Sequence, residues 1–194
     1  MMKKYTRKSL APGTLEAPLP PAMVTVGDFD NANVLTVAWT GTICSEPAMA
    51  YVSIRPERHS YEIVKRTGEF VINLTTEALA EATDWCGVRS GSDYNKFREM
   101  GLTPGKAAIV NAPIIEESPL CIECRVKEII PLGSHEMYIA DVVNVMADEK
   151  YINKETGKFE LSDSDPLVYL HGGYYHLGEK IGKFGWSVEK KKTK

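Results

Sequence analysis

The amino-acid sequence predicts one mainly β domain, folded as a barrel or a sandwich. Short runs rich in β-branched residues recur along most of the chain, at the regular spacing that is typical of these architectures. Segments with helical spacing are few and irregular, which argues against a doubly wound α/β sheet. The 194 residues are enough for one domain with a sizeable core and too few for two full domains.

The chain opens with a proline-containing lead-in segment, residues 1–20, that shows little periodicity. We expect this segment to lie on the surface or against a neighbouring molecule. The first clear β patterns follow it, in runs that are bounded by turn-forming residues. These runs predict three strands, over residues 22–26, 33–39 and 49–55.

The pattern changes to helical spacing after Arg58, because Tyr61 and Val64 lie one turn apart. Gly68 is placed as the C-terminal stop of this short helix. The elements that come next are predicted from their composition and turn signals. They are a strand over residues 69–74, a helix over residues 77–83, a glycine- and serine-rich loop over residues 85–93 and a helix that carries Lys96 and Phe97.

The second half of the chain returns to β patterns and ends in a run of lysines. The lysine-rich tail, residues 188–194, is expected to be a solvated terminus. We therefore interpret residues 1–194 as a single domain with a lead-in segment and a basic tail. The predicted elements of this half are strands over residues 120–130, 137–147 and 166–170, with turns at residues 131–133 and 153–157.

Composition and charge narrow the possible partners. The formal net charge is -3 at pH 7 and no basic patch lies in the central part of the chain, so we do not expect nucleic-acid binding. No stretch approaches the roughly 20 apolar residues of a membrane span, and no apolar segment typical of a signal peptide follows the N-terminus. We expect a cytoplasmic protein without a membrane partner, in which the four cysteines stay reduced.

The sequence lacks several well-known kinds of catalytic and metal site. Cys121 and Cys124 are three positions apart in a predicted strand, so their side chains should point to opposite faces, and no second pair completes a zinc site. The four histidines form no metal-binding motif. No serine lies in a hydrolase nucleophile elbow, and the glycine fingerprints of Rossmann and P-loop sites are missing.

The segment at residues 53–60 gathers groups that suit a phosphate. Arg55 and Arg58 carry forked donors that match the geometry of a phosphate dianion. The helix that begins near His59 and Ser60 would direct free amides and the positive end of its dipole at the same anion. The alternative is that both arginines pair with neighbouring glutamates on a solvated helix face. Spacing alone leaves the two interpretations open.

Trp39 and the small residues after it are candidates for lining a flat ring. Thr40, Gly41 and Thr42 leave a predicted strand, and Gly41 would let backbone amides come close to a ligand. A flavin needs such donors, because its reduction places negative charge on the ring. The alternatives are that Trp39 belongs to the core and that the loop at residues 85–93 is a plain connector.

Taken in order, these segments resemble the flavin reductase-like family of FMN-binding split barrels, and in particular its flavoredoxin-like branch. The resemblance extends over roughly residues 20–178, and the order of seven segments makes it more specific than any one motif. The segments are NVLTVAWTGTICSEPAMAYVSIRPERHSYEIV, GEFVINL, CGVRSGSDYNKF, GLTP, ESPLCIECRV, GSHEMYIADVV and LVYLHGGYYHLGE.

The resemblance implies a mainly β, FMN-binding split β-barrel with Greek-key connections, a few peripheral helices and one noncovalent FMN. It also implies which residues surround the cofactor. Asn33, Trp39, Thr40, Gly41 and Thr42 would lie along the isoalloxazine ring; Ser53, Ile54, Arg55, Arg58, His59 and Ser60 would follow the ribityl chain and phosphate; Ser90, Gly91, Lys96 and Phe97 would close the other side; and Tyr169 and His135, the candidate catalytic residue, would approach the exposed face of the ring.

By the same resemblance we expect a homodimer that transfers electrons as an NAD(P)H-dependent flavin or FMN reductase. Family members that reduce free flavin usually carry Asp-Pro-Pro and Gly-Asp-His. This chain has Glu-Pro-Ala at residues 46–48 and Gly-Ser-His at residues 133–135, so two alternatives stay open. One is a flavoredoxin-type carrier that a protein partner reduces without nicotinamide, and the other is a non-catalytic barrel for a different ligand.

Overall fold

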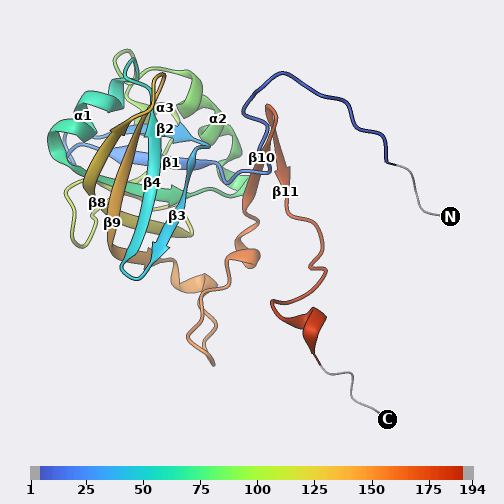
Figure 1. Cartoon of the computed structure of the whole chain (residues 1–194). Coiled ribbons are helices and arrows are strands. Elements are labelled where there is room, and N and C mark those ends of the chain that lie inside the picture. The colour runs from blue at the N-terminus through green and yellow to red at the C-terminus, as the bar shows by residue number, and fades with distance from the viewer. Residues whose placement is uncertain (1–4, 190–194) are drawn as a thin grey trace, which may run out of the picture.

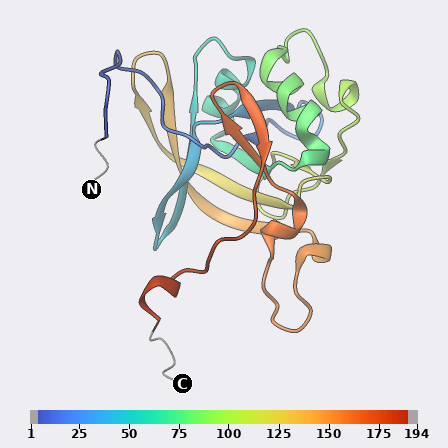
Figure 2. The same ribbon diagram turned by 90° about the vertical axis from the view of Figure 1, so that its right-hand side faces the viewer.

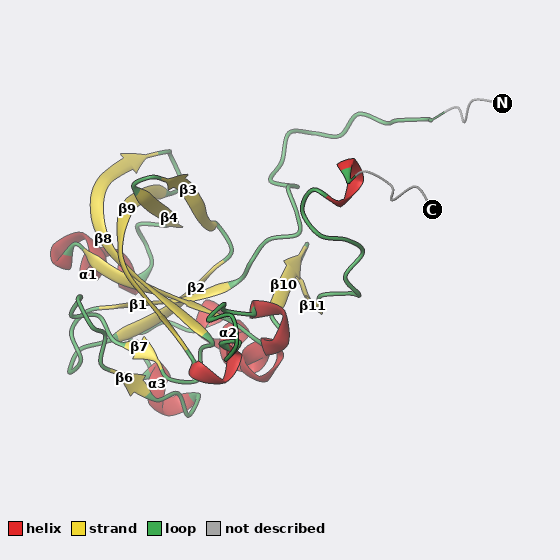
Figure 3. Cartoon of the chain, turned by 90° about the horizontal axis from the view of Figure 1, so that it is seen from below, coloured by secondary structure: helices red, strands yellow, loops and turns green. Residues whose placement is uncertain are grey.

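The computed structural model describes residues 5–189, and its centre is one antiparallel sheet that curls into a split barrel (Figure 1). The strand order is β2-β1-β5-β8-β9-β4-β3, and the long strands β8 and β9 cross from one half of the barrel to the other (Figure 3). The predicted mainly β split barrel is confirmed. The strands are β1 Ala22–Val26, β2 Asn33–Val37, β3 Thr40–Ser45, β4 Ala48–Ile54, β5 Glu69–Leu74, β8 Leu120–Pro131 and β9 Glu136–Ala147.

Side chains alternate between the two faces of each strand, and those on the inner face fill the barrel. Val24 on β1, Phe70 on β5 and Tyr138 on β9 all point into the same fully buried core. Cys124 also lies in this core, whereas Cys121 packs on the opposite side of β8. The prediction that the two cysteines point to opposite faces is therefore confirmed, and all four cysteines are free.

Helices cover part of the outer surface of the barrel. The α2 helix (Ala80–Val88) and the α3 helix (Lys96–Glu99) pack over the outward side chains of β1 and β2, with Phe97 inserted between them and the sheet. The α1 helix (His59–Thr67) contributes Tyr61 to the barrel core and ends at Gly68, which adopts the left-handed conformation. The predicted helix and its stop are thus confirmed.

A small hairpin stands apart from the main sheet, and both terminal segments extend beyond it (Figure 2). Leu19 of the lead-in segment exchanges two backbone hydrogen bonds of 2.9 Å with Tyr169 of the hairpin. No helix within residues 5–189 is long and apolar enough to cross a membrane. The hairpin consists of β10 (Leu167–Leu170) and β11 (Gly173–His176), and the remaining short elements are β6 (Pro104–Gly105), β7 (Ile114–Ile115), η1 (Glu77–Leu79), η2 (Glu149–Tyr151), η3 (Leu161–Ser164) and η4 (Trp186–Val188).

Three local predictions are corrected by the structure. The predicted loop at residues 85–93 begins later, because α2 continues to Val88. Gly87 fits inside this helix because a Cβ atom there would lie only 3.2 Å from Cβ of Thr36 on β2, so glycine permits close helix–strand packing. The strands β3 and β11 were not predicted; β3 is a largely exposed edge strand and lacks a buried face. The helix predicted over residues 77–83 is observed as η1 followed by α2.

Residues 190–194 of the predicted basic tail lie outside the described residues.

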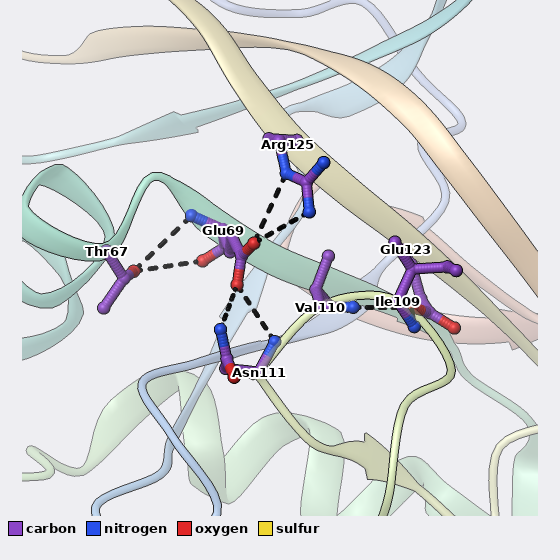
Figure 4. A network of polar contacts seen from close by, with 7 residues as sticks. All are labelled: Thr67, Glu69, Ile109, Val110, Asn111, Glu123 and Arg125. Atoms are coloured by element: carbon purple, nitrogen blue, oxygen red, sulfur yellow. Dashed lines mark hydrogen bonds and ion pairs between the residues drawn. The ribbon is translucent and has the colours of Figure 1, made fainter.

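Two carboxylates fasten the segment at residues 106–112 to the sheet (Figure 4). Glu123 on β8 is fully buried and accepts hydrogen bonds of 2.7 to 3.0 Å from the backbone amides of residues 108–110. Glu69 on β5 accepts two more, each 2.9 Å, from the backbone and side-chain amides of Asn111. These bonds hold an irregular segment over an otherwise open part of the sheet.

The hydroxyl of Tyr138 is the one buried side-chain polar atom in residues 5–189 that has no hydrogen-bond partner. Burial also raises the pKa of this phenol well above its usual value. An unsatisfied buried hydroxyl destabilises the folded state by about 1 kcal/mol or more. We expect Tyr138→Phe to keep or raise the free energy of unfolding in urea, whereas Tyr61→Phe, which removes the 2.9 Å bond to Lys65, should lower it. A clear loss of stability in Tyr138→Phe would contradict this assignment.

Candidate functional site

Two adjoining cavities lie between the barrel and α2, and the larger of them also borders the β10–β11 hairpin. The larger has a volume of about 390 Å³, which is within the usual range for ligand pockets. The smaller has a volume of about 120 Å³. Thr36, Arg58 and Gly87 line both, so one elongated ligand could extend from the larger cavity into the smaller.

Most of the predicted site residues meet in these cavities, although they come from segments far apart in the sequence. Arg58 lines both cavities. In the larger one it is joined by Trp39, Ser53, Ile54, Arg55, His135 and Tyr169, and in the smaller one by Asn33, His59, Ser60, Ser90, Gly91 and Lys96.

Trp39 and His135 form an aromatic pair in the larger cavity. Their ring centroids are 4.4 Å apart and the rings are tilted by 57°. Partial burial and the nearby positive charge of Arg55 lower the pKa of His135, so the imidazole is neutral at pH 7. The Oγ atom of Ser134 lies 2.9 Å from Nδ1 of His135 and fixes the orientation of the ring. This end of the cavity offers a flat, mainly uncharged surface.

Lys96 dominates the smaller cavity because its charge is buried without a counter-ion. The residue is 4% exposed, and its Nζ donates one hydrogen bond of 2.7 Å, to the carbonyl oxygen of Cys86. It forms no ion pair with any carboxylate in the described part of the chain. Burial lowers the pKa of Lys96 to about 8, and the charge of Arg58 adds to this effect. A buried ammonium group in this state favours an incoming anion.

Several other groups around Lys96 are also donors, and Glu57, whose side chain is 65% exposed, is the one carboxylate among the described residues that lines the smaller cavity. The α1 helix begins at His59 without a side-chain cap, so its first backbone amides remain available to an anion. Ser60 accepts a 2.7 Å hydrogen bond from Nδ2 of Asn33, which leaves the Ser60 hydroxyl hydrogen free to donate. A Cβ atom at Gly91 would lie 2.1 Å from Oδ1 of Asn33, so only glycine fits at this wall.

Four predicted site residues line neither cavity. Thr40 donates a 2.8 Å hydrogen bond to the carbonyl oxygen of Tyr51, Gly41 and Thr42 continue along the edge strand β3, and Phe97 packs in the core. Phe97 therefore supports α3 and, through it, the position of Lys96. Contact of these four residues with a cofactor stays a prediction.

Asp84 on α2 and Tyr174 on β11 line the larger cavity and were missed by the sequence analysis. The Tyr174 hydroxyl donates a 3.3 Å hydrogen bond to Oδ1 of Asp84. The ring of Tyr174 lies 5.5 Å from the ring of Tyr169, centroid to centroid, and is tilted against it by 58°. No local pattern signals these residues, because α2 and the hairpin are separated by about eighty residues and meet only in the folded chain. Within residues 5–189 no cluster of His, Cys, Asp or Glu could hold a metal ion.

The chemistry of the combined site is that of a binding pocket for a phosphorylated, aromatic molecule. One end presents an indole and a neutral imidazole, and the other presents an ammonium, a guanidinium and free helix amides. Lys96 offers a positive charge without a counter-ion at one end, and Trp39 offers a flat aromatic surface at the other.

Comparisons with known proteins agree with this chemistry. A family model described as "Flavin reductase like domain" matches residues 15–178. The flavoredoxin of Desulfovibrio vulgaris (Miyazaki F) is 30% identical, with a TM-score of 0.87, over 95% of this chain and 100% of that protein. The flavoredoxin from Methanosarcina acetivorans, 23% identical, shares the fold with a TM-score of 0.85, over 95% of this chain and 100% of that one. An NADH-dependent FMN reductase of Streptomyces nodosus subsp. asukaensis is 25% identical over 156 residues, which is 80% of this chain and 77% of that protein.

Proposed function

Since this chain belongs to the flavin reductase-like family, we propose that it binds FMN noncovalently and transfers electrons as an NAD(P)H-dependent flavin or FMN reductase. The observation that carries the proposal is the buried, unpaired charge of Lys96 in the smaller of two adjoining cavities, of which the larger is aromatic. A phosphomonoester on a flat heteroaromatic molecule satisfies both ends at once. FMN is such a molecule.

In this proposal the phosphate lies among Lys96, Arg58, Ser60 and the first amides of α1. The ammonium and guanidinium groups balance the two negative charges of the phosphate, and the helix amides supply further donors. Arg58 makes no ion pair within the described residues, and its one hydrogen bond, of 3.4 Å to the Gly87 carbonyl oxygen, is weak. Its guanidinium is therefore free to turn toward the anion.

The ring of FMN would lie in the larger cavity, against Trp39 and His135. The flavin, when bound, supplies the redox chemistry. The protein holds the ring, excludes water from one face and presents the neutral His135 as a hydrogen-bonding group or proton relay. Tyr169 and Tyr174 of the hairpin form the facing wall, so the space that remains between hairpin and ring is where a second planar molecule would enter.

A flavoredoxin-type carrier is the second candidate function. It is favoured by the similarity to the Desulfovibrio flavoredoxin, which covers nearly all of both chains. In this version a protein partner reduces the bound flavin and nicotinamide does not bind. The departures at residues 46–48 and 133–135 from the residues usual in members that reduce free flavin also favour the carrier, and they leave FMN binding unaffected.

We also propose that the protein works as a homodimer in the cytoplasm. Large apolar side chains on the C-terminal segment, such as Ile181 and Phe184, are 93% and 107% exposed in the single chain. Leu10 of the lead-in segment is 71% exposed. Contact with a second subunit would remove this apolar surface from water.

The test of the proposed function is an anaerobic titration of the purified protein. We expect a yellow protein with a visible flavin band that NADH or NADPH bleaches. A band that dithionite bleaches but neither nucleotide does would favour the carrier. A colourless protein that takes up no FMN at micromolar concentration would contradict both versions and favour a barrel for another ligand.

A further inference from the structure

The cations around the two cavities fall into two separate groups. Lys96 and His59 line only the smaller cavity, and Arg55 lines only the larger one. Arg58 lies between them and lines both. Trp39 and His135 share the larger cavity with Arg55, so the Arg55 guanidinium belongs to the aromatic end of the pocket and not to the phosphate end.

We infer that Arg55 is the anion-binding residue for the pyrophosphate of the dinucleotide hydride donor, distinct from the site that holds the phosphate of FMN. The inference rests on the proposed reductase function and names the part of the substrate that this end of the pocket would recognise. Arg58 and Lys96 are left to the flavin. The family resemblance, by contrast, implies that both arginines follow the ribityl chain and phosphate of FMN.

The exposure of the two cationic groups supports this division. A cofactor that stays bound can be held by a buried charge, and Lys96 is 4% exposed. A substrate that enters and leaves in each turnover needs an accessible group, and the side chain of Arg55 is 46% exposed. The fork of an arginine also matches two oxygens of a pyrophosphate, as it matches carboxylate and phosphate elsewhere.

Arg55 is held in place by only one weak contact. Its Nη1 lies 3.5 Å from Oε1 of Glu57, whose side chain is 65% exposed. Ion pairs this exposed contribute little to stability, so a dinucleotide could displace the Glu57 carboxylate at small cost. The ring of His135 is neutral and does not compete for the anion. Asp84 is the one carboxylate in the described part of the chain that lines this cavity, and it is hydrogen-bonded to Tyr174, whereas Glu57 lines the smaller cavity.

The placement also fits the dimensions of the donor. A dihydronicotinamide ring that stacks on the flavin would lie between the flavin and Tyr169 and Tyr174 of the hairpin, in the cavity that Arg55 also lines. The pyrophosphate is separated from that ring by one ribose, so we expect its charge to lie close to the same cavity. Arg55 is the cationic side chain confined to this cavity within residues 5–189.

The test is a kinetic comparison of Arg55→Ala with the wild-type protein, both loaded with FMN. We expect the KM for NADH and for NADPH to rise about tenfold in each case, the change for loss of roughly one charge-assisted contact, with kcat changed much less. The dissociation constant of NAD⁺ for the oxidised, FMN-loaded protein, measured from the flavin absorbance, should rise by the same factor. FMN should stay bound.

Two further variants make the result specific. Glu57→Gln removes the competing carboxylate and should lower the KM for either nucleotide by about a factor of two, measured at saturating FMN because Glu57 also lines the smaller cavity. Arg98→Ala removes an arginine with the same charge that lines neither cavity and should leave the KM unchanged.

Each outcome separates the inference from the function on which it rests. Loss of FMN from Arg55→Ala would place this arginine at the flavin phosphate and overturn the inference. An unchanged KM for both nucleotides would overturn the pyrophosphate assignment. A KM that rises for NADPH alone would also overturn it, and would indicate that Arg55 binds the 2′-phosphate instead. If neither nucleotide reduces the wild-type flavin, the reductase function itself fails, and the inference with it.

Discussion

Replacing Lys96 by methionine is expected to weaken FMN binding by roughly 100-fold while making the apoprotein more stable. The loss of affinity follows because a charge-assisted hydrogen bond to a phosphate contributes about 1.5 to 3 kcal/mol, and each 1.4 kcal/mol is about tenfold. The gain in stability follows because the ammonium group is buried with one carbonyl oxygen as its only partner. Methionine has a similar length and needs no counter-ion.

The size of the gain can be bounded from the pKa of Lys96, which burial lowers from 10.5 to about 8. Such a shift means that the folded apoprotein disfavours the charged form, by on the order of 3 kcal/mol at pH 7. The flavin titration and the urea unfolding of the apoprotein should therefore move in opposite directions. Lys106→Met, at an exposed lysine outside both cavities, should change neither.

Lys96 also determines how the stability of the apoprotein and its affinity for FMN should depend on pH. Between about pH 8 and pH 10.5 the folded apoprotein has released the Lys96 proton and the unfolded chain still holds it, so the free energy of unfolding should rise with pH. FMN affinity should fall over the same range, because binding must restore the charged form. Lys96→Met should lack both slopes. Unchanged FMN retention in this variant would mean that the phosphate binds elsewhere.

Much of the fold follows from local sequence patterns, and the elements that were predicted wrongly have local causes. The buried strands were predicted correctly because strands that are buried on one or both faces are rich in β-branched and apolar residues, as in residues 22–26. The edge strand β3 escaped prediction because little of it is buried, so no alternation is imposed on it. Gly87 suggested a loop, whereas the structure uses it for contact between α2 and Thr36.

The site was predictable where its residues are close in sequence and unpredictable where the fold joins distant segments. Arg55 and Arg58 were predicted as site residues because they lie close together in the segment at residues 53–60, and the family resemblance added Lys96. No pattern indicated that Arg55 would face a different cavity from Lys96, because that division depends on how α1 leaves β4. The pairing of Asp84 with Tyr174 also exists only in the folded chain.

Replacing Glu123 by glutamine is expected to lower the free energy of unfolding by about 3 kcal/mol, the largest loss that we anticipate for a single nearly isosteric change. The carboxylate accepts hydrogen bonds from three backbone amides at residues 108–110 and a fourth, of 2.7 Å, from Asn144. Burial alone would raise its pKa, but the bonds from Asn144 and the three amides outweigh burial and lower it. An amide nitrogen at this position would face donors and leave at least one of them unsatisfied.

The pH dependence distinguishes this role from simple packing. Because the folded-state pKa of Glu123 lies below the ordinary 4.5, its stabilising effect is complete above that pH and disappears as the pH falls through the folded value. The stability difference between wild type and Glu123→Gln, measured by urea unfolding, should therefore shrink in acid. Glu128→Gln, on the exposed side of the same strand, should show no such difference. FMN affinity should be unaffected by Glu123→Gln, because the segment at residues 106–112 lines neither cavity. Equal stability of Glu123→Gln and Glu128→Gln at pH 7 would refute the anchoring role of Glu123.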